Sequence, residues 1–266
     1  MSVPVGPAFQ AGLWDQRIAR ARSLAEDSST ASPILAFYAD LAEFQQHIVR
    51  NSRPRADLLE AAEAAAASIA DFLDWLHGHA PSPLAAAAAE GRARPLPAWK
   101  TLLAHRVEEG QSDEDGPTAF IVEAVLQPFV ERAAQTAEVR LKADATYPAR
   151  CPICGSLPVV AALREEGQGA RRSLLCALCF HEWDYLRIQC PSCEENRFDA
   201  LPVYTADAPA SARIDACDTC RTYIKTIDLT TDGLAVPTVD DIASLPLDLW
   251  ARERGYHRLY PNLLRI

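Results

Sequence analysis

The sequence predicts an α+β protein with an all-α N-terminal domain, two small four-cysteine modules and a C-terminal helix. Apolar residues recur every three or four positions over the first half of the chain. All eight cysteines lie between Cys151 and Cys220, in four Cys-x-x-Cys pairs. Short β-type runs separate these pairs, and a helical pattern returns after Gly233. We therefore expect four regions: residues 1–147, 148–186, 187–232 and 233–266.

The N-terminal region predicts a bundle of helices. The first helical pattern begins at Trp14, and the second follows Pro33, at a position where a first helical turn tolerates proline. The third is rich in alanines, which allow neighbouring helices to approach closely. An acidic, glycine-containing segment at 108–116 predicts an exposed loop. The expected helices are 14–25, 34–49, 55–77, 97–107 and 117–143.

The region after residue 148 predicts short strands between cysteine pairs, followed by helices. Each strand is a β-type run, and Pro246 interrupts what would otherwise be one long C-terminal helix. We expect a short turn from Val239 and a helix from Pro246 to Arg254, which Gly255 ends. The expected strands are 159–163, 173–175, 185–188 and 222–227.

The overall composition excludes some classes of protein. The chain has 266 residues and a formal net charge of -10, and neither half carries the basic stripe that phosphate binding needs, so we expect no nucleic-acid partner. The longest apolar run, at 61–70, is too short to span a bilayer, so we expect no membrane insertion. Met1 to Trp14 shows no secretory signal, which predicts a cytoplasmic protein. In that reducing compartment, closely spaced cysteines favour metal binding over disulfides.

The cysteine spacing predicts two four-sulfur metal sites. A two-residue gap lets both sulfurs of a pair hold one ion, and a hairpin of about 20 residues brings two pairs together. The first two pairs are separated by 21 residues and the last two by 23, so no cysteine is left over. The first site would use Cys151, Cys154, Cys176 and Cys179, and the second Cys190, Cys193, Cys217 and Cys220.

The spacing leaves three interpretations of these modules. Two zinc ribbons would stabilise a small domain, whereas iron in rubredoxin-like sites would use the same four thiolates with a redox-capable ion. Spacing does not separate the two ions. Thiol–disulfide exchange is the weakest interpretation, because no thioredoxin-type βαβ pattern surrounds any pair. Four protein sulfurs leave no open coordination position, which argues against hydrolysis at the ion.

Several side chains beside the cysteines are candidates for a structural or binding role. Glu182 and Lys225 are costly to bury unpaired, so we expect a salt bridge or a backbone clamp between the modules. Trp183 and Tyr185 are expected to cover a metal site or to form a binding surface. His181 lies two positions after Cys179, but eight cysteines already fill two sites, so we do not expect it to be a ligand.

The sequence around the cysteines resembles the formate dehydrogenase accessory protein family, FdhE. The resemblance covers roughly residues 148–266. It is carried by Cys151-Pro-Ile-Cys-Gly-Ser-Leu-Pro-Val159, Leu175-Cys-Ala-Leu-Cys179 with Glu182-Trp183, Arg187-Ile-Gln-Cys-Pro-Ser-Cys193, Cys217-Asp-Thr-Cys-Arg-Thr-Tyr-Ile-Lys225, Asp240-Asp-Ile-Ala-Ser-Leu-Pro-Leu-Asp-Leu-Trp250, Gly255-Tyr256 and Pro261-Asn262.

The resemblance implies a maturation factor that is not itself an enzyme. Its partner would be the catalytic subunit of a respiratory formate dehydrogenase, bound in the cytoplasm before twin-arginine export. The implied fold is a helical domain followed by two rubredoxin-like modules, with iron favoured as the ion and zinc as the alternative. A zinc-ribbon nucleic-acid-binding protein and a small rubredoxin-like electron carrier remain the alternative functions, and the oligomeric state is open.

Overall fold

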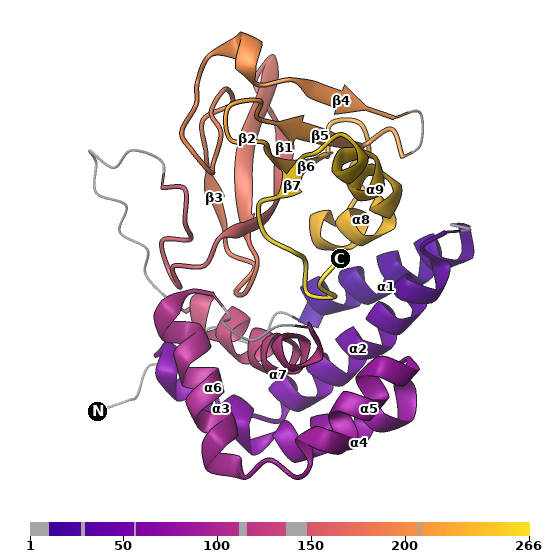
Figure 1. The fold of residues 1–266 in the computed structure, drawn as a ribbon, viewed down its shortest axis with the longest axis vertical. Coiled ribbons are helices and arrows are strands. Elements are labelled where there is room, and N and C mark those ends of the chain that lie inside the picture. The colour runs from indigo at the N-terminus through magenta and orange to yellow at the C-terminus, as the bar shows by residue number, and fades with distance from the viewer. Residues whose placement is uncertain (1–10, 28–29, 56, 112–115, 137–147, 207–208) are drawn as a thin grey trace.

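The computed structural model describes residues 11–27, 30–55, 57–111, 116–136, 148–206 and 209–266. Seven described helices from the first half of the chain form one end of the molecule, and a twisted sheet forms the other (Figure 1). Two C-terminal helices lie against the sheet, and the C-terminus lies between the two ends (Figure 1). This arrangement confirms the α+β fold class. The divisions that we expect at residues 147, 186 and 232 stay predictions.

The helical end confirms the helices expected near 14–25, 34–49 and 97–107. Helix α7 is its centre, since nearly all of its side chains are buried and α2, α3, α4, α5 and α6 all contact it. No described helix is both long and apolar enough to cross a membrane. The helices are α1 (Ala11–Asp27), α2 (Ser32–Arg50), α3 (Leu58–Ala67), α4 (Ile69–His79), α5 (Ser82–Gly91), α6 (Leu96–Glu109) and α7 (Gly116–Ala134).

The structure differs from the expectations for this end in four places. The single helix expected at 55–77 is two helices, because the chain turns at Ser68, whose N–H donates to the Ala65 carbonyl. Helix α5 was not expected, since its run of alanines shows no apolar stripe. Helix α7 ends at Ala134, short of residue 143, and residues 137–147 lie outside the described residues. The loop expected at 108–116 begins only after α6 ends at Glu109, and its residues 112–115 are likewise not described.

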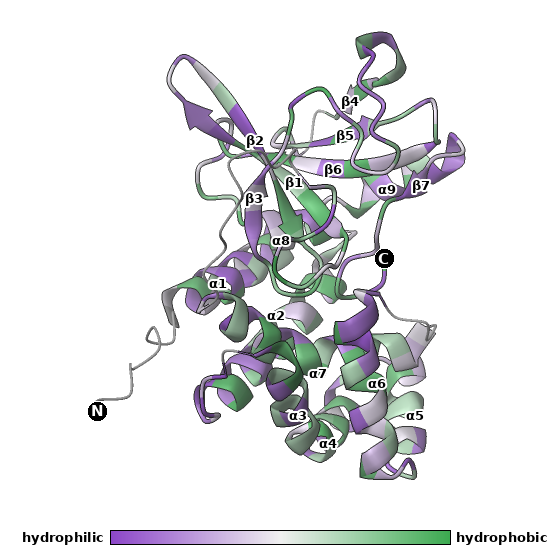
Figure 2. Ribbon diagram, turned by 90° about the vertical axis from the view of Figure 1, so that its left-hand side faces the viewer, coloured by the Kyte–Doolittle hydropathy of each residue, from purple (hydrophilic) through white to green (hydrophobic). Residues whose placement is uncertain are grey.

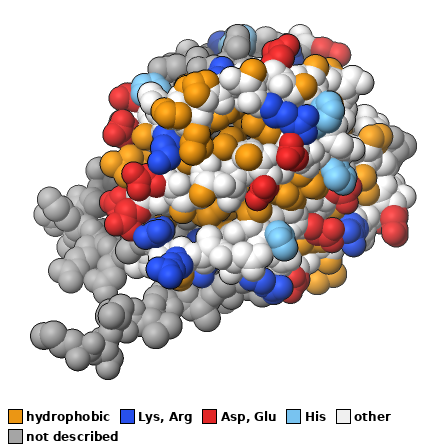
Figure 3. Space-filling model, turned by 90° about the horizontal axis from the view of Figure 1, so that it is seen from below, with side chains coloured by type: hydrophobic (Ala, Val, Ile, Leu, Met, Phe, Trp, Pro, Cys, Tyr) orange, Lys and Arg blue, Asp and Glu red, His pale blue; other side chains and the backbone are white. Residues whose placement is uncertain are grey.

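The far end of the helical part carries both signs of charge. Acidic and basic side chains are interspersed among apolar ones over this face (Figure 3). Phosphate binding calls instead for a continuous basic stripe. The expectation that nucleic acid is not the partner stays a prediction.

The strands of both cysteine modules join in one sheet, in the order β3-β2-β1-β6-β5-β4, with β7 paired to β6. Strands β1 and β2 form an antiparallel hairpin whose far tip is hydrophilic (Figure 2). The strands are β1 (Pro158–Glu166), β2 (Gly169–Cys176), β3 (Glu182–Asp184), β4 (Val203–Thr205), β5 (Ala212–Ala216), β6 (Thr222–Asp228) and β7 (His257–Arg258).

The sheet is built from two copies of the same unit. Each module contributes three antiparallel strands, β1 to β3 and β4 to β6, with a cysteine pair before the first strand and another before the third. The units meet where β1 pairs in parallel with β6, with Val160 opposite Lys225. Neither unit therefore stands alone as a separate sheet.

Three of the four expected strands are confirmed, and one is misplaced. The run 185–188 is not a strand; the strand lies just before it, at Glu182–Asp184, where Trp183 pairs with Leu174. The Leu186 carbonyl accepts from the Arg172 guanidinium, so a side chain satisfies it in place of a neighbouring strand. Strands β4, β5 and β7 were not expected.

Helices α8 (Pro237–Ala243) and α9 (Leu245–Glu253) confirm the expected C-terminal pattern. They lie against the sheet (Figure 1), and α9 packs into an apolar cluster that includes Val160, Ile214 and Ile227. A second apolar cluster is continuous from the helical end to the four cysteines of the first module. The first cysteine group therefore lies where the two ends of the molecule meet.

Candidate metal centres

The same backbone turn holds all four cysteine pairs. In each, the N–H of the first cysteine donates to the carbonyl five residues later. The residue after each pair has a left-handed φ: Gly155 at 70°, Phe180 at 52°, Glu194 at 62° and Arg221 at 59°. That conformation favours glycine and costs other residues about 1–2 kcal/mol. Three of the four turns bear this cost, which the rest of each turn has to offset.

These turns bring the eight cysteines into two groups of four. The ligand atoms within each group all lie within 4.8 Å of one another. Site 1 contains Cys151, Cys154, Cys176 and Cys179, and site 2 contains Cys190, Cys193, Cys217 and Cys220. The grouping is the one that the spacing predicts.

The sulfur separations match the edges of a metal tetrahedron. At site 2 the Cys190–Cys220 and Cys193–Cys217 sulfurs are each 3.7 Å apart, and at site 1 the measured separations run from 3.3 to 3.6 Å. A disulfide would need about 2.05 Å. Four sulfurs at about 2.3 Å from one ion would be about 3.8 Å apart. The donor set therefore fits a four-coordinate ion, and thiolate sulfur suits iron and zinc alike.

Backbone N–H groups point at the sulfurs as well. Those of Leu178 and Cys179 lie 3.3 and 3.4 Å from the Cys176 sulfur, and that of Ser192 lies 3.4 Å from the Cys190 sulfur. Such donors stabilise negative charge on a thiolate. One cysteine turn of each site, at Cys176 and at Cys190, thus has backbone donors that favour an anionic sulfur.

The thiol pKa values within each group shift in opposite directions. At site 1, hydrogen bonds from Cys151, Cys176 and Cys179 lower the pKa of Cys154, whereas burial raises that of Cys176. At site 2, burial opposes ionisation of Cys220, but hydrogen bonds from Thr222 and neighbouring thiols lower its pKa to about 6. Burial raises the pKa of Cys190. A cation bound among the four sulfurs would favour the thiolate form of each.

Site 1 lies buried at the interface where the helical end packs against the sheet. All four of its cysteines are buried. Arg106 of α6 donates to Ser156, just after the first cysteine pair, and also pairs with Glu123 of α7 at 2.9 Å. Arg17 of α1 lies 4.7 Å from the Phe180 ring and pairs with Glu131 of α7. Each cysteine turn of this site is therefore tied to the helical end by a buried arginine.

Site 2 lies near the surface. Cys193 is exposed and Cys220 is half-buried, whereas Cys190 and Cys217 are buried. Its polar neighbours Thr219 and Arg197 are exposed, and both contact the half-buried Glu195: Thr219 donates to it at 2.7 Å and Arg197 pairs with it. These contacts come from the second module itself and not from the described helices α1 to α7, so the two sites share a turn and differ in their surroundings.

The residues beside the cysteines are paired, but not as expected. Glu182 does not meet Lys225; it pairs with Arg164 at 2.8 Å and accepts from Ser173, within the first module. Although burial opposes it, these contacts lower the pKa of Glu182. The expected clamp between modules is replaced by the parallel pairing of β1 with β6.

Trp183 and Tyr185 are buried beside the cysteines, which agrees with the interpretation that they cover a metal site and not with a binding surface. Trp183 is buried, and its indole N–H donates to the Pro148 carbonyl at 2.8 Å. Tyr185 is buried, with its hydroxyl 3.4 Å from the Cys190 carbonyl. His181 stacks with Trp183 and lies outside both four-cysteine groups.

Lys225 instead belongs to a buried ionic cluster that sequence reasoning missed. Its ammonium lies 2.5 Å from Asp248 and 3.2 Å from Asp241, and Arg258 pairs with both carboxylates. Asn262 donates to Asp241. Arg258 and Lys225 keep the pKa of Asp241 low despite its burial. The sequence evidence that could have indicated this cluster is the acidic tail segment at 240–250. The cluster ties α8 and α9 to the sheet.

Comparisons with known proteins agree with this construction. Family models described as "FdhE, central domain" and "FdhE, C-terminal domain" match residues 150–187 and 188–265. A "Protein FdhE homolog" from Aquifex aeolicus is 36% identical over 166 residues, covering 62% of this chain and 57% of that protein. One from Pseudomonas putida is 31% identical over 290 residues, covering 96% of this chain and 87% of that protein.

A solved structure extends the likeness to the whole fold. "The crystal structure of the FdhE protein from Pseudomonas aeruginosa" superposes with a TM-score of 0.76 at 25% identity. The match covers 98% of this chain and 99% of that one, so it includes the helical end, for which the sequence offered no motif. Together with the two cysteine groups, these similarities show that the chain belongs to the FdhE family.

Proposed function

We propose that this chain is a cytoplasmic accessory protein needed for the activity of a respiratory formate dehydrogenase. It would bind the catalytic subunit of that enzyme before twin-arginine export, and would not itself be an enzyme. The observation that carries the proposal is the match to an FdhE homolog over 96% of this chain. The four-cysteine donor sets agree with a binding role, since four sulfurs around an ion leave no position for a substrate.

The eight cysteines are proposed as the ligands of two metal ions, one at each site. The sulfur separations, the backbone N–H donors and the pairing of low-pKa with high-pKa thiols all support this assignment. Iron is the favoured ion and zinc the alternative. A bound ion would hold each pair of turns together, and iron would also supply one-electron redox chemistry.

The metal assignment is tested on anaerobically purified protein by elemental analysis together with an absorption spectrum, repeated after oxidation. We expect two ions per chain. Ferric tetrathiolate absorbs visible light, and zinc tetrathiolate does not, so the spectrum separates the two ions. Fewer than one ion per chain, in protein that remains folded, would contradict the ligand assignment.

The partner is tested by purifying a tagged version of this protein from cells that express formate dehydrogenase. The catalytic subunit should be recovered with it, and deletion of the gene should abolish formate dehydrogenase activity. The catalytic subunit should be recovered even while its twin-arginine export signal is uncleaved, because binding precedes export. Failure to recover the subunit, with activity intact in the deletion strain, would refute the function.

An electron-carrier role is the second candidate, and the surface position of site 2 is the observation that favours it. An exposed ligand shortens the distance over which an electron would pass to a partner. The iron form should then show reversible reduction at a physiological potential. A zinc-only protein that still supports formate dehydrogenase activity would remove this candidate and leave the accessory role.

A further inference from the structure

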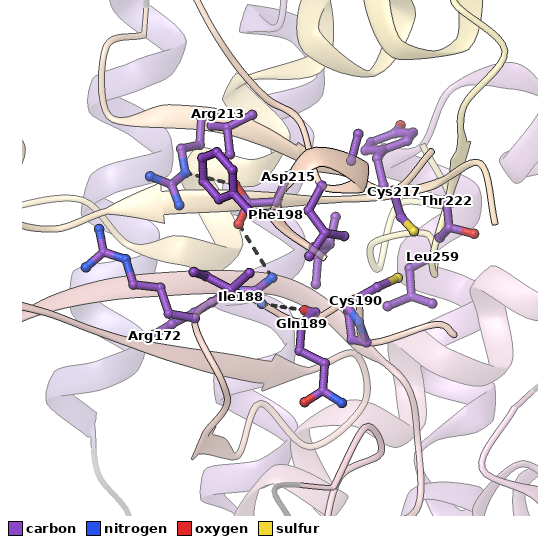
Figure 4. Close-up of a pocket in the computed structure, with 17 residues that line it drawn as sticks. Arg172, Ile188, Gln189, Cys190, Phe198, Arg213, Asp215, Cys217, Thr222 and Leu259 are labelled. Atoms are coloured by element: carbon purple, nitrogen blue, oxygen red, sulfur yellow. Dashed lines mark hydrogen bonds and ion pairs between the residues drawn. The ribbon is translucent and has the colours of Figure 1, made fainter. Parts of the chain in front are cut away.

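A cavity of about 230 Å³ lies beside site 2, between β2, β5 and the segment 186–191 (Figure 4). Cys190 and Cys217 are among its lining residues, so it adjoins the proposed metal site. It opens on the side of the sheet away from α8 and α9. Ile224 of β6 lines it, whereas the next residue, Lys225, contacts Asp241 and Asp248 on the opposite side. Neither C-terminal helix covers this part of the sheet.

The rim of the cavity is apolar and exposed. Phe198 is 80% exposed, Val203 51% and Ile188 50%. Nine large apolar side chains are exposed among the described residues, and three of them gather here. Single exposed apolar residues need no explanation, but an exposed group around a cavity marks an interaction site. The rim favours an occupant that buries an apolar side chain.

The polar part of the lining is basic. Arg172, Arg187 and Arg213 line the cavity together with one carboxylate, Asp215, in a chain whose net charge is -10. Asp215 serves two of the three guanidiniums: Arg213 donates to it at 2.9 Å, and Arg172 lies 3.5 Å from it (Figure 4). Among these four side chains positive charge exceeds negative charge. The thiolates of the proposed metal site add negative charge through Cys190 and Cys217, on the other side of the cavity from Arg172 and Arg213 (Figure 4). An anionic group on the occupant would restore the balance beside the arginines.

Arg172 strengthens this argument because it is almost wholly buried. One of its terminal nitrogens donates to the carbonyls of Leu186 and Gln189, at 3.1 and 3.0 Å. Its Nε has no hydrogen-bond partner in the described structure. Burial lowers the pKa of Arg172, and the nearby Asp215 carboxylate opposes that shift. An anion in the cavity would favour the charged guanidinium in the same way as Asp215 does.

The cavity is somewhat smaller than the usual small-molecule pocket. Pockets that enclose a small molecule typically hold about 300–1,000 Å³. The volume here would take one or two side chains, and the exposed rim would continue the contact along the surface. These dimensions suit a polypeptide segment that inserts a side chain and lies across the rim.

We propose that this cavity binds a segment of the catalytic subunit in which a large apolar side chain is adjacent to an aspartate or glutamate. The proposal rests on the proposed function, since it names the surface through which the accessory protein would hold its partner. The apolar side chain enters between Phe198 and Ile188. The carboxylate faces Arg187 and Arg213.

The test compares the full-length, metal-loaded protein with four variants for binding to immobilised catalytic subunit. Phe198→Ala removes an exposed apolar side chain at the rim, and Leu234→Ala is its matched control, since Leu234 is 81% exposed and lies outside the cavity. Arg187→Glu reverses a rim charge, and Arg252→Glu reverses an exposed charge on α9. Melting temperature and metal content should be the same in all five proteins.

The dissociation constant should rise at least tenfold for Phe198→Ala and Arg187→Glu, and stay within twofold for the two controls. Unchanged affinity in the cavity variants would overturn the proposal and leave the proposed function standing; this is also the result if a small molecule occupies the cavity. Absence of binding by the unmodified protein would instead refute the proposed function itself.

Overlapping 12-residue peptides from the catalytic subunit then identify the segment. The bound peptides should carry an acidic residue next to a large apolar one. Replacing the acidic residue by asparagine or glutamine should weaken binding of the peptide at least fivefold. Raising the salt concentration should weaken it as well. Equal binding of the neutral peptides would overturn the charge assignment.

Discussion

The two cysteine sites are built from the same turn and placed in opposite surroundings. Site 1 lies under the helical end, with four buried cysteines and two buried arginines that join its turns to α1, α6 and α7. Site 2 lies at the surface, where Cys193 is exposed. The difference teaches that the ligand set does not decide what such a site does. Site 1 lies inside the apolar cluster that joins the two ends of the molecule, and site 2 lies at the surface, where we propose that the partner binds.

The sharpest test of this contrast is removal of one sulfur from each site. Cys176→Ser should eliminate the ion at site 1, whose loss costs on the order of 10 kcal/mol. That is comparable to the whole stability of a typical domain. Because the apolar cluster around site 1 continues into the helical end, we expect little soluble folded protein, measured by yield and by circular dichroism.

The matched variant, Cys193→Ser, should lose one ion and keep the helical circular dichroism signal and its melting transition. Two equally damaged variants would remove the distinction between the sites. A Cys176→Ser protein that melts as the unmodified protein does, with one ion bound, would show that site 1 does not hold the two ends together.

A second contrast comes from an arginine–glutamate pair beside each site. Arg106 and Glu123 are both almost fully buried, with side chains 1% and 4% exposed. Arg106→Ala would leave the buried Glu123 carboxylate with only Arg265 and Tyr260 as partners, so it should cost unfolding free energy at the lower end of the range for a broken buried pair, about 3 kcal/mol. Chemical denaturation measures this loss.

Arg197→Ala removes the corresponding partner of Glu195 beside site 2. Arg197 is 64% exposed, and Glu195 keeps its hydrogen bond from Thr219 without it, so we expect a loss of unfolding free energy much smaller than that of Arg106→Ala. A loss comparable to that of Arg106→Ala would mean that the surroundings of site 2 are as rigid and as important for folding as those of site 1.

The smallest effect is expected from relieving backbone strain. Glu194→Gly at site 2 removes left-handed strain of about 1 kcal/mol, offset in part by the greater unfolded-state entropy of glycine. We expect a gain of up to about 0.5 kcal/mol in unfolding free energy. Phe180→Gly at site 1 relieves the same kind of left-handed strain, but it also removes the ring that stacks on Arg17. It should therefore lower the unfolding free energy. Equal gains at both positions would show that the Phe180–Arg17 contact contributes nothing.

The contrast between the sites was not accessible from the sequence. Four Cys-x-x-Cys pairs and their spacing predicted the two groups correctly, because a short hairpin brings consecutive pairs together. Their burial depends on which parts of the chain pack against them. Arg17 and Phe180 are 163 positions apart, and no local pattern announces that they meet.

The same limit explains the other differences. Lys225 was expected to pair between modules, but its partners Asp241 and Asp248 lie in the C-terminal helices. The short strands β4 and β5 carry few residues for an alternating pattern, and their partner β6 supplies the pairing. Helix positions with a strong apolar stripe were predicted well, whereas the alanine-rich α5 was not. Long-range pairing, which decides each of these cases, leaves little trace in a single sequence.

The most direct test of the account is the rate at which metal leaves each site. Metal-loaded protein is incubated anaerobically with excess chelator, and samples are desalted and analysed for bound metal over time. The account predicts two ions per chain, one released at least tenfold faster than the other, and a Cys193→Ser protein that lacks only the fast phase. A single rate for both ions, or a fast phase that survives in Cys193→Ser, would contradict it.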